Sequence, residues 1–354
     1  MKKNASNSLE KEHSLEKLQE MVKKYGQSSC SYLALEEDKK IYFGKKVEGL
    51  VAYGQVGCVC VVCGDPICAP EDFTTLLEEF QDFYQKKRCR CIFMDAGQNH
   101  LDDYQNQGLS FVKSGEEALF ELKEYSLSGS QKKKLRNQLK YATKAQLKVH
   151  EYKPQAGRDM EIEAGIKAVS SDWVQTKKSS QLGFTIGDVG LEMPLDRRYF
   201  YARDQAGQIV AFNVFLPFAR MNGYVADVTR RLSTAPRGVT ELLTYEGFMT
   251  FKEEGFRWGS LGPTPLVNLR EEGHKLSLTL KFLELVYEKG NAFFGFKDLH
   301  RAKRKYSPTD WVPRYLVFST KMLTPSLAYA MIKVQNPGGL KDYIRVSLKK
   351  KRNG

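Results

Sequence analysis

Apolar side chains recur every three or four positions between residues 239 and 254, a spacing that predicts a helix with one buried face. A short apolar run begins at Tyr224 and ends in a charged segment that contains Asp227. Gly255 can terminate the helix, and the apolar residues after it predict another short strand. The predicted unit is strand, charged loop, helix and strand. Its helix N-terminus and strand end meet at one crevice, which suits an anionic ligand.

The remaining apolar segments predict a mixed α/β protein. Short apolar segments alternate with glycine-containing turns between residues 31 and 63, which predicts a meander of strands. Two apolar runs on either side of a turn predict a hairpin over residues 199–218. Acidic residues after Pro70 favour the start of a helix there, and residues 1–26 predict an N-terminal helix.

The length of the chain suits two domains. It has 354 residues, of which 42% are hydrophobic and 12% aromatic, enough to form packed interiors. We predict a first α/β domain over residues 31–127 and a second over residues 151–322. A helix over residues 1–30 precedes them, a basic helix over residues 128–150 joins them, and a basic tail over residues 323–354 follows.

The charge of the chain predicts an anionic partner. Its formal net charge is +13, which favours binding to nucleic acid or to an acidic membrane surface. The basic connecting helix has almost no acidic residues, so a contact with a phosphate backbone and a merely solvated helix face are both open. Its candidate contact residues are Lys132, Lys133, Lys134, Arg136 and Lys140.

The sequence predicts a protein without a transmembrane segment. No apolar run approaches the roughly 18 to 20 residues that a membrane-spanning helix needs. The N-terminus lacks the apolar core and cleavage site of a signal peptide, so we expect a cytoplasmic protein. The tail from Leu340 to Leu348 has apolar residues interspersed with basic ones. Two interpretations stay open: an amphipathic helix that lies on the inner face of the membrane, or a solvated terminus.

Seven cysteines all lie between Cys30 and Cys91, an odd number that favours reduced thiols. The run from Cys58 to Cys63 alternates like a buried strand, in which a free cysteine acts as a small apolar residue. Its spacing lacks the paired arrangement of zinc sites. We therefore expect no bound metal.

Several motifs, in their order along the chain, resemble the C-terminal catalytic domain of phosphatidylglycerol lysyltransferases, the multiple peptide resistance factor proteins. DVTRRLSTAPRGVTELL begins at Asp227, FKEEGFRWGSLGPTPL begins at Phe251, and LHRAKRKYSPTDWVPRYL begins at Leu299. The likeness extends from about Tyr42 to Phe318. It implies tandem domains of the GCN5-related N-acetyltransferase (GNAT) type joined by the basic helix, in a stand-alone form without the membrane flippase domain.

The resemblance implies a reaction. An amino acid, with lysine or alanine favoured, would pass from a charged tRNA to a hydroxyl of phosphatidylglycerol or a related anionic phospholipid. The donor is an activated ester, so no cofactor is expected besides the aminoacyl-tRNA co-substrate. Consistent with this, the sequence has no phosphate-binding loop, nucleophile elbow or dinucleotide fingerprint. The basic helix would then contact the tRNA.

Such a transfer needs a base, a group that stabilises an oxyanion and a group that holds the ammonium of the amino acid. By resemblance, Asp227 is the candidate base or ammonium ligand, and Arg230 would orient it or bind phosphate. Lys303 and Lys305 are candidates for oxyanion or phosphate stabilisation, and we expect both to face Asp227 in one pocket. Each could instead form a surface ion pair. Further candidate substrate-binding residues are Arg231, Gly238, Trp173, Lys177, Phe184 and Arg314.

Some positions depart from the family pattern. Ala302 replaces an aromatic residue, residues 232–234 stand where the family is often acidic, and Arg237 stands where asparagine is frequent. Three alternative functions therefore stay open: a GNAT-type acyl-CoA-dependent N-acyltransferase, a Fem-like aminoacyl-tRNA transferase, and a non-catalytic module that binds tRNA or a membrane. No sequence feature sets the amino acid, the lipid or the oligomeric state.

Overall fold

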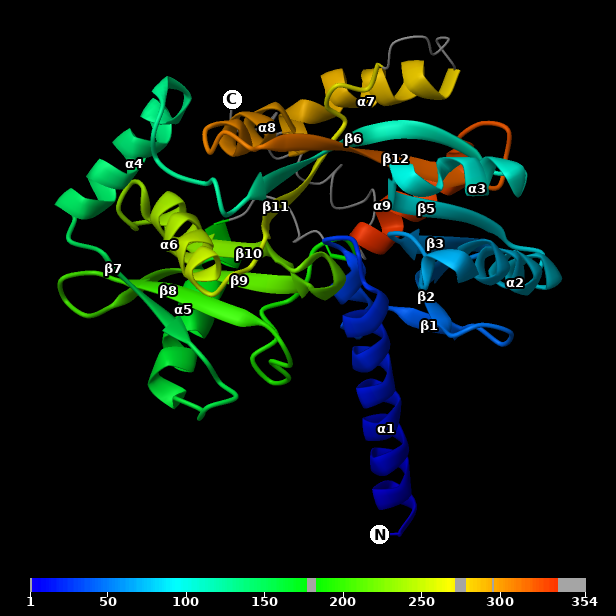
Figure 1. Ribbon diagram of the computed structural model, residues 1–354, viewed down its shortest axis with the longest axis horizontal. Coiled ribbons are helices and arrows are strands. Elements are labelled where there is room, and N and C mark those ends of the chain that lie inside the picture. The colour runs from blue at the N-terminus through cyan, green and yellow to red at the C-terminus, as the bar shows by residue number, and fades with distance from the viewer. Residues whose placement is uncertain (1, 177–182, 271–277, 295, 337–354) are drawn as a thin grey trace.

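The computed structural model describes residues 2–176, 183–270, 278–294 and 296–336. Within these residues the strands form a single twelve-stranded mixed sheet, which confirms the predicted α/β class. Its order from one edge to the other is β1-β2-β3-β5-β12-β6-β11-β10-β9-β8-β7, and β4 pairs with β2 (Figure 1). The strands are β1 (Lys40–Phe43), β2 (Gly49–Val56), β3 (Val59–Cys63), β4 (Ile67–Cys68), β5 (Arg90–Gly97), β6 (Ser110–Glu121), β7 (Lys148–Tyr152), β8 (Arg198–Arg203), β9 (Ile209–Phe218), β10 (Gly223–Arg231), β11 (Trp258–Pro265) and β12 (Asp310–Phe318).

Helices cover both faces of this sheet. One face packs on α1, α5, α7 and α9 through a single apolar cluster. The other face packs on α2 and α3 at the β1 end and on α4 and α6 at the β7 end, through two further clusters. The helices are α1 (Lys2–Tyr25), α2 (Phe73–Lys86), α3 (Leu101–Asn106), α4 (Lys133–Lys144), α5 (Met160–Thr176), α6 (Val239–Glu253), α7 (Leu278–Phe294), α8 (Phe296–Arg304) and α9 (Pro325–Gln335).

The two halves of the sheet are joined by a strand from late in the chain. β12 lies antiparallel between β5 and β6, although more than 180 residues separate β6 from β12 along the chain. β6 in turn pairs with β11, so backbone hydrogen bonds run from the first half of the sheet into the second. The central strands β12, β6, β11 and β10 bring together residues that are far apart in sequence.

Several predicted elements are confirmed. The predicted helix over residues 239–254 is α6, and the predicted hairpin is the antiparallel pair β8 and β9. The predicted meander is partly wrong, because Ser31–Leu35 forms a 3₁₀ helix. All five of its residues are buried, so it packs as a turn inside the core and does not alternate like a strand.

Part of the predicted tail belongs to the packed fold. Residues 325–335 form α9, which begins with Pro325 and is capped by the Thr324 side chain. Leu327 and Ala330 are buried, and α9 packs on β2 and β3. The predicted amphipathic segment from Leu340 to Leu348 lies outside the described residues. No helix in the described parts of the chain is both long and apolar enough to cross a bilayer.

Candidate functional site

The fold places Asp227 at an irregularity of the sheet. The pairing of β10 with β9 shifts register between Ala226 and Val228, so Asp227 lies at a β-bulge. The side chain is half-buried, and the Gly187 amide donates a 2.8 Å hydrogen bond to its Oδ2 atom. Burial raises the pKa of Asp227 to about 7, although the hydrogen bond from Gly187 opposes the shift. A carboxyl group with this pKa can accept and release a proton near neutral pH.

Three charged side chains surround this carboxyl group. The negative charge of Glu36 raises the pKa of Asp227 further, whereas the positive charges of Arg197 and Lys39 lower it. The Glu36 Oε1 atom accepts 2.8 Å and 3.2 Å hydrogen bonds, from Arg197 Nη2 and from the Asp188 amide. Glu36 and Arg197 were not predicted from the sequence, because they lie outside the motifs that carry the family resemblance.

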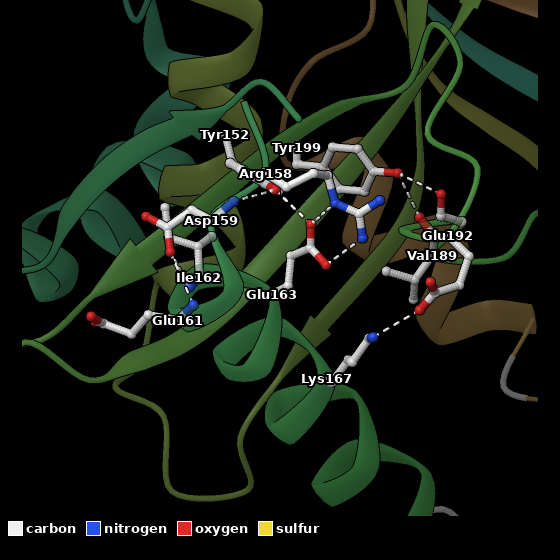
Figure 2. A network of polar contacts seen from close by, with 11 residues as sticks. Tyr152, Arg158, Asp159, Glu161, Ile162, Glu163, Lys167, Val189, Glu192 and Tyr199 are labelled. Carbon is white, nitrogen blue, oxygen red and sulfur yellow. Dashed lines mark hydrogen bonds and ion pairs between the residues drawn. The ribbon is translucent and has the colours of Figure 1, made fainter. Parts of the chain in front are cut away.

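The loop that carries Gly187 is anchored by a polar network, which Figure 2 shows. The Tyr199 hydroxyl donates to the backbone oxygens of Val189 and Gly190, at 2.9 Å and 3.1 Å. An ion pair of 2.8 Å joins Lys167 on α5 to Glu192 on the loop. These contacts tie the loop to β8 and α5, so the Gly187 amide is held in place against Asp227.

Arg230 lies three residues after Asp227 and is 4% exposed. Its guanidinium carbon lies 5.0 Å from the centroid of a Trp173 ring, and its Nη1 atom donates to the Ser170 hydroxyl. Burial lowers the pKa of Arg230, an effect that the charges of Asp188 and Asp227 oppose. Its Nη2 atom is buried and lacks a hydrogen-bond partner among the described residues. A buried guanidinium nitrogen without a partner can donate a hydrogen bond to an anionic or carbonyl oxygen of a ligand.

Lys303 is buried in the centre of the sheet. Its Nζ atom donates to the backbone oxygens of Gly262 and Pro263, both at 2.8 Å. Burial lowers the pKa of Lys303 to about 7, although the charges of Glu117 and Asp95 oppose the shift. A Cβ atom added at Gly262 would lie 4.0 Å from Lys303 Nζ and 3.7 Å from Val225. The ammonium therefore lies against β11, the strand that pairs with β10.

Arg314 belongs to the same buried cluster as Lys303. Its Nε atom donates to Glu117 Oε2 at 2.9 Å, and Ser260 donates to the other oxygen of that carboxylate. Burial alone would raise the pKa of Glu117, but Arg314 and Ser260 lower it overall. Burial raises the pKa of the neighbouring Asp95 to about 6. Asp95 and Glu117 were not predicted from the sequence; only Asp95 carried a signal, as an acidic residue directly after the apolar run of β5.

The expectation that both lysines face Asp227 needs correction for Lys305. The Lys305 ammonium forms an ion pair with Glu241 in the first turn of α6. Lys303 lies in the last turn of α8 and Lys305 follows its last residue, and side chains two residues apart there point to different sides. The structure thus brings Lys303 to the centre of the sheet and turns Lys305 towards α6.

Two of the remaining candidates are held by packing. Gly238 has a φ of 87°, and a Cβ atom there would lie 2.1 Å from the backbone oxygen of Gln138, so glycine is required where α6 meets α4. Phe184 is 1% exposed, and its ring lies 4.5 Å from Lys39 Nζ. Arg231 is exposed, and Lys177 lies outside the described residues.

The predicted contact residues on α4, together with Lys132 just before it, fall into two groups. Lys132 donates to the Ser126 backbone oxygen at 2.7 Å, and Arg136 donates to those of Leu127 and Gly129, both at 2.6 Å. These two side chains hold the preceding loop. The other predicted contact residues, Lys133, Lys134 and Lys140, are exposed.

No metal centre accompanies these polar residues in the described ranges. Those ranges contain no group of three or more His, Cys, Asp or Glu side chains that could hold a metal ion.

Comparisons with known proteins bear on the family of the chain. The family model for "Phosphatidylglycerol lysyltransferase, C-terminal" matches residues 19–318. A phosphatidylglycerol lysyltransferase of Staphylococcus epidermidis is 28% identical over 314 residues, which are 89% of this chain and 36% of that protein. One of Bacillus subtilis is 27% identical over 303 residues, which are 86% of this chain and 35% of that protein. The chain thus spans little more than a third of the length of these relatives.

A solved structure agrees with the family match. The structure of L-PGS from Bacillus licheniformis superimposes with a TM-score of 0.76 at 24% identity, covering 91% of this chain and 96% of that one. This similarity shows that the two chains share a fold.

Proposed function

Because the chain belongs to the phosphatidylglycerol lysyltransferase C-terminal family, we propose that it transfers an amino acid from a charged tRNA to a hydroxyl of phosphatidylglycerol. The family resemblance that the sequence motifs indicated is confirmed. The relatives that match most of this chain are named phosphatidylglycerol lysyltransferase. The proposal rests mainly on two neighbouring side chains of β10, Asp227 and Arg230. Asp227 has a pKa near 7, and the neighbouring Arg230 keeps one buried donor open.

The proposed chemistry exchanges one ester for another. The lipid hydroxyl attacks the carbonyl carbon of the aminoacyl ester, a new carbon–oxygen bond forms, and the bond to the ribose oxygen breaks. Asp227 takes the proton of the attacking hydroxyl and returns it to the ribose oxygen that leaves. Asp227 in its ionised form is equally suited to hold the ammonium of the amino acid, and these two roles stay as alternatives. No metal or cofactor is needed for this exchange of equivalent bonds.

Cationic donors would stabilise the negative charge that develops on the carbonyl oxygen. Arg230 Nη2 is one donor, and Lys303, which contacts Gly262 on the neighbouring strand β11, is the other. Burial strengthens such an interaction because the surroundings screen charge poorly. Lys305 is a weaker candidate, since Glu241 already neutralises its charge.

An apolar groove supports a lipid as the acceptor. The groove lies between α7 and α9, has a volume of about 340 Å³ and is lined by Leu278, Phe282, Met322 and Tyr329 among others. These four side chains are between 44% and 67% exposed, and the exposed Lys281 and Lys321 adjoin them in sequence. Apolar surface beside ammonium groups suits the acyl chains and phosphate of an anionic lipid.

The test is transfer by the purified chain. It would be mixed with tRNA charged with radiolabelled lysine or alanine and with vesicles that contain phosphatidylglycerol, and the lipid would be extracted. We expect a labelled, positively charged lipid with the parent chain and none with Asp227→Asn. Vesicles of phosphatidylcholine alone serve as the control. Absence of labelled lipid with both tRNAs, together with acetyl transfer from acetyl-coenzyme A to an amine, would overturn the proposal.

A further inference from the structure

An exposed aromatic side chain lies on the basic helix α4, beside the start of α6. Tyr141 is 46% exposed, and the guanidinium carbon of Arg237 lies 4.3 Å from the centroid of its ring. The Nε atom of Arg237 also donates a 3.1 Å hydrogen bond to the Gln138 side chain. Arg237 is therefore held against the tyrosine from the α6 side, although both residues are open to solvent.

The position of this pair is fixed by close packing beneath it. The Gln138 backbone oxygen lies so near Gly238 that only glycine fits there, as described above. Leu139 and Ala142 of α4 share one buried cluster with Val239 of α6. The two helices thus hold the pair on a rigid base, which lowers the entropy lost when a flat ligand stacks on it.

The surface around the pair is strongly basic. Lys134 and Lys144 are exposed and lie seven residues before and three residues after Tyr141, so they share its face of the helix. The segment from Lys133 to Lys144 contains no Asp or Glu. An exposed ring next to arginine, flanked by lysines without acids, combines a stacking surface with charges for phosphates. Unpaired nucleic acid is bound by this combination.

We propose that Tyr141 and Arg237 form a stacking platform for an unpaired base near the 3′ end of the tRNA, while Lys134 and Lys144 contact its phosphates. This inference rests on the proposed function. Residues 232–238 connect the platform directly to the end of β10, which carries Asp227 and Arg230. A base held on Tyr141 would therefore direct the end of the strand, with its aminoacyl ester, towards those two residues.

Binding of two labelled RNA hairpins tests the platform, one with an unpaired 3′ strand and one blunt. Loss of one base–aromatic stack weakens binding by about 5- to 100-fold. We expect Tyr141→Ala to weaken binding of the hairpin with the unpaired strand by this factor and to leave the blunt hairpin unchanged. Tyr141→Phe should bind like the parent. Met160→Ala on α5 is the control, because that side chain is 69% exposed and lies on another helix.

Salt dependence separates stacking from charge. The double change Lys134→Ala and Lys144→Ala should weaken both hairpins and reduce the slope of affinity against salt, whereas Tyr141→Ala should leave the slope unchanged. Equal binding of the unpaired strand by the parent and Tyr141→Ala, or equal losses for both hairpins, would overturn the inference. Thermal unfolding confirms that each variant is folded.

A negative result in the RNA-binding experiment can be told apart from a failure of the proposed lipid transfer. Selective loss of the unpaired strand in a chain that forms no aminoacyl lipid would support the platform and refute the transfer. Transfer to lipid by a chain whose RNA binding ignores Tyr141 would refute the platform alone.

Discussion

The Gly187 amide donates a 2.8 Å hydrogen bond to Oδ2 of Asp227, so a loop far away in sequence orients the carboxylate. A Cβ atom at Gly187 would lie 2.6 Å from that oxygen and 2.8 Å from Glu36 Oε1. We expect Gly187→Ala to displace Asp227 and to lower kcat/KM for transfer by about a hundredfold, as small misplacements of reacting groups do. Gly183→Ala is the control, because the nearest atom to its Cβ lies 3.9 Å away. Full activity of Gly187→Ala would contradict a role for this carboxylate.

The pH dependence of transfer should be bell-shaped with its maximum near pH 7. Asp227 must lose its proton to act as a base or ammonium ligand, so the rate rises as the pH passes its pKa of about 7. Lys303 must keep its proton to stabilise an oxyanion, and its lowered pKa of about 7 makes the rate fall at higher pH. Initial rates between pH 5 and pH 9, corrected for spontaneous hydrolysis of the aminoacyl ester, would measure this. A rate independent of pH over that range would exclude both assignments.

Asp227→Asn should stabilise the fold at alkaline pH. The carboxyl pKa is about 3.9 in an unfolded chain and about 7 in the fold, so the folded state binds the proton more tightly. The charged carboxylate therefore destabilises the fold increasingly as the pH rises from about 4 to about 7. Asparagine carries no charge and still accepts from the Gly187 amide. Melting temperatures should show a larger gain at pH 8 than at pH 5, and an equal gain at both would contradict the raised pKa.

Replacement of the two lysines should have different effects on transfer. Lys303→Met removes a buried ammonium next to β11, and loss of one such donor lowers kcat by about 100- to 1,000-fold in other enzymes. Lys305→Met instead leaves Glu241 without its ion-pair partner, so we expect a lower melting temperature and a change in kcat of less than about fivefold. Single-turnover rates and thermal unfolding of both variants provide the comparison. The reverse order of rates would assign the stabilising role to Lys305.

The apolar groove should determine lipid binding. Phe282→Ser on α7 removes apolar surface that is 44% exposed, and we expect binding to phosphatidylglycerol vesicles to weaken by roughly tenfold. Leu299→Ser on α8 removes a side chain of similar exposure, 38%, that does not line the groove, and serves as the control. Vesicle co-sedimentation measures the difference. Equal losses for the two variants would argue against the groove as the lipid site.

Local patterns in the sequence were sufficient for the elements that depend on nearby residues. The spacing of Leu243, Phe248 and Phe251 predicted α6, because one face of a helix is buried along its whole length. The motif order also predicted the family and the closeness of Asp227 and Arg230, although both lie on β10 and not in the charged loop that we expected. These features need no knowledge of distant contacts.

Contacts between distant segments could not be predicted in this way. The residues near Glu117 in the sequence do not indicate that Arg314 will contact it, because β6 and β12 pair only in the folded sheet. The two lysines of one motif differ for a similar reason: Glu241, which binds Lys305, lies on another helix. Tyr141 resembled any solvated residue of a basic helix until the structure placed Arg237 against its ring.

The place of β12 has a consequence for biosynthesis. A nascent chain emerges from the ribosome N-terminus first, so β5 and β6 leave it long before residues 310–318 are made. Until then both strands lack the neighbour that separates them, and their open edges are exposed to other chains. The early part of the polypeptide therefore stays incompletely folded until β12, residues 310–318, has been translated. Premature termination before residue 318 should leave an aggregating fragment, even though the truncated chain would contain Asp227 and Arg230.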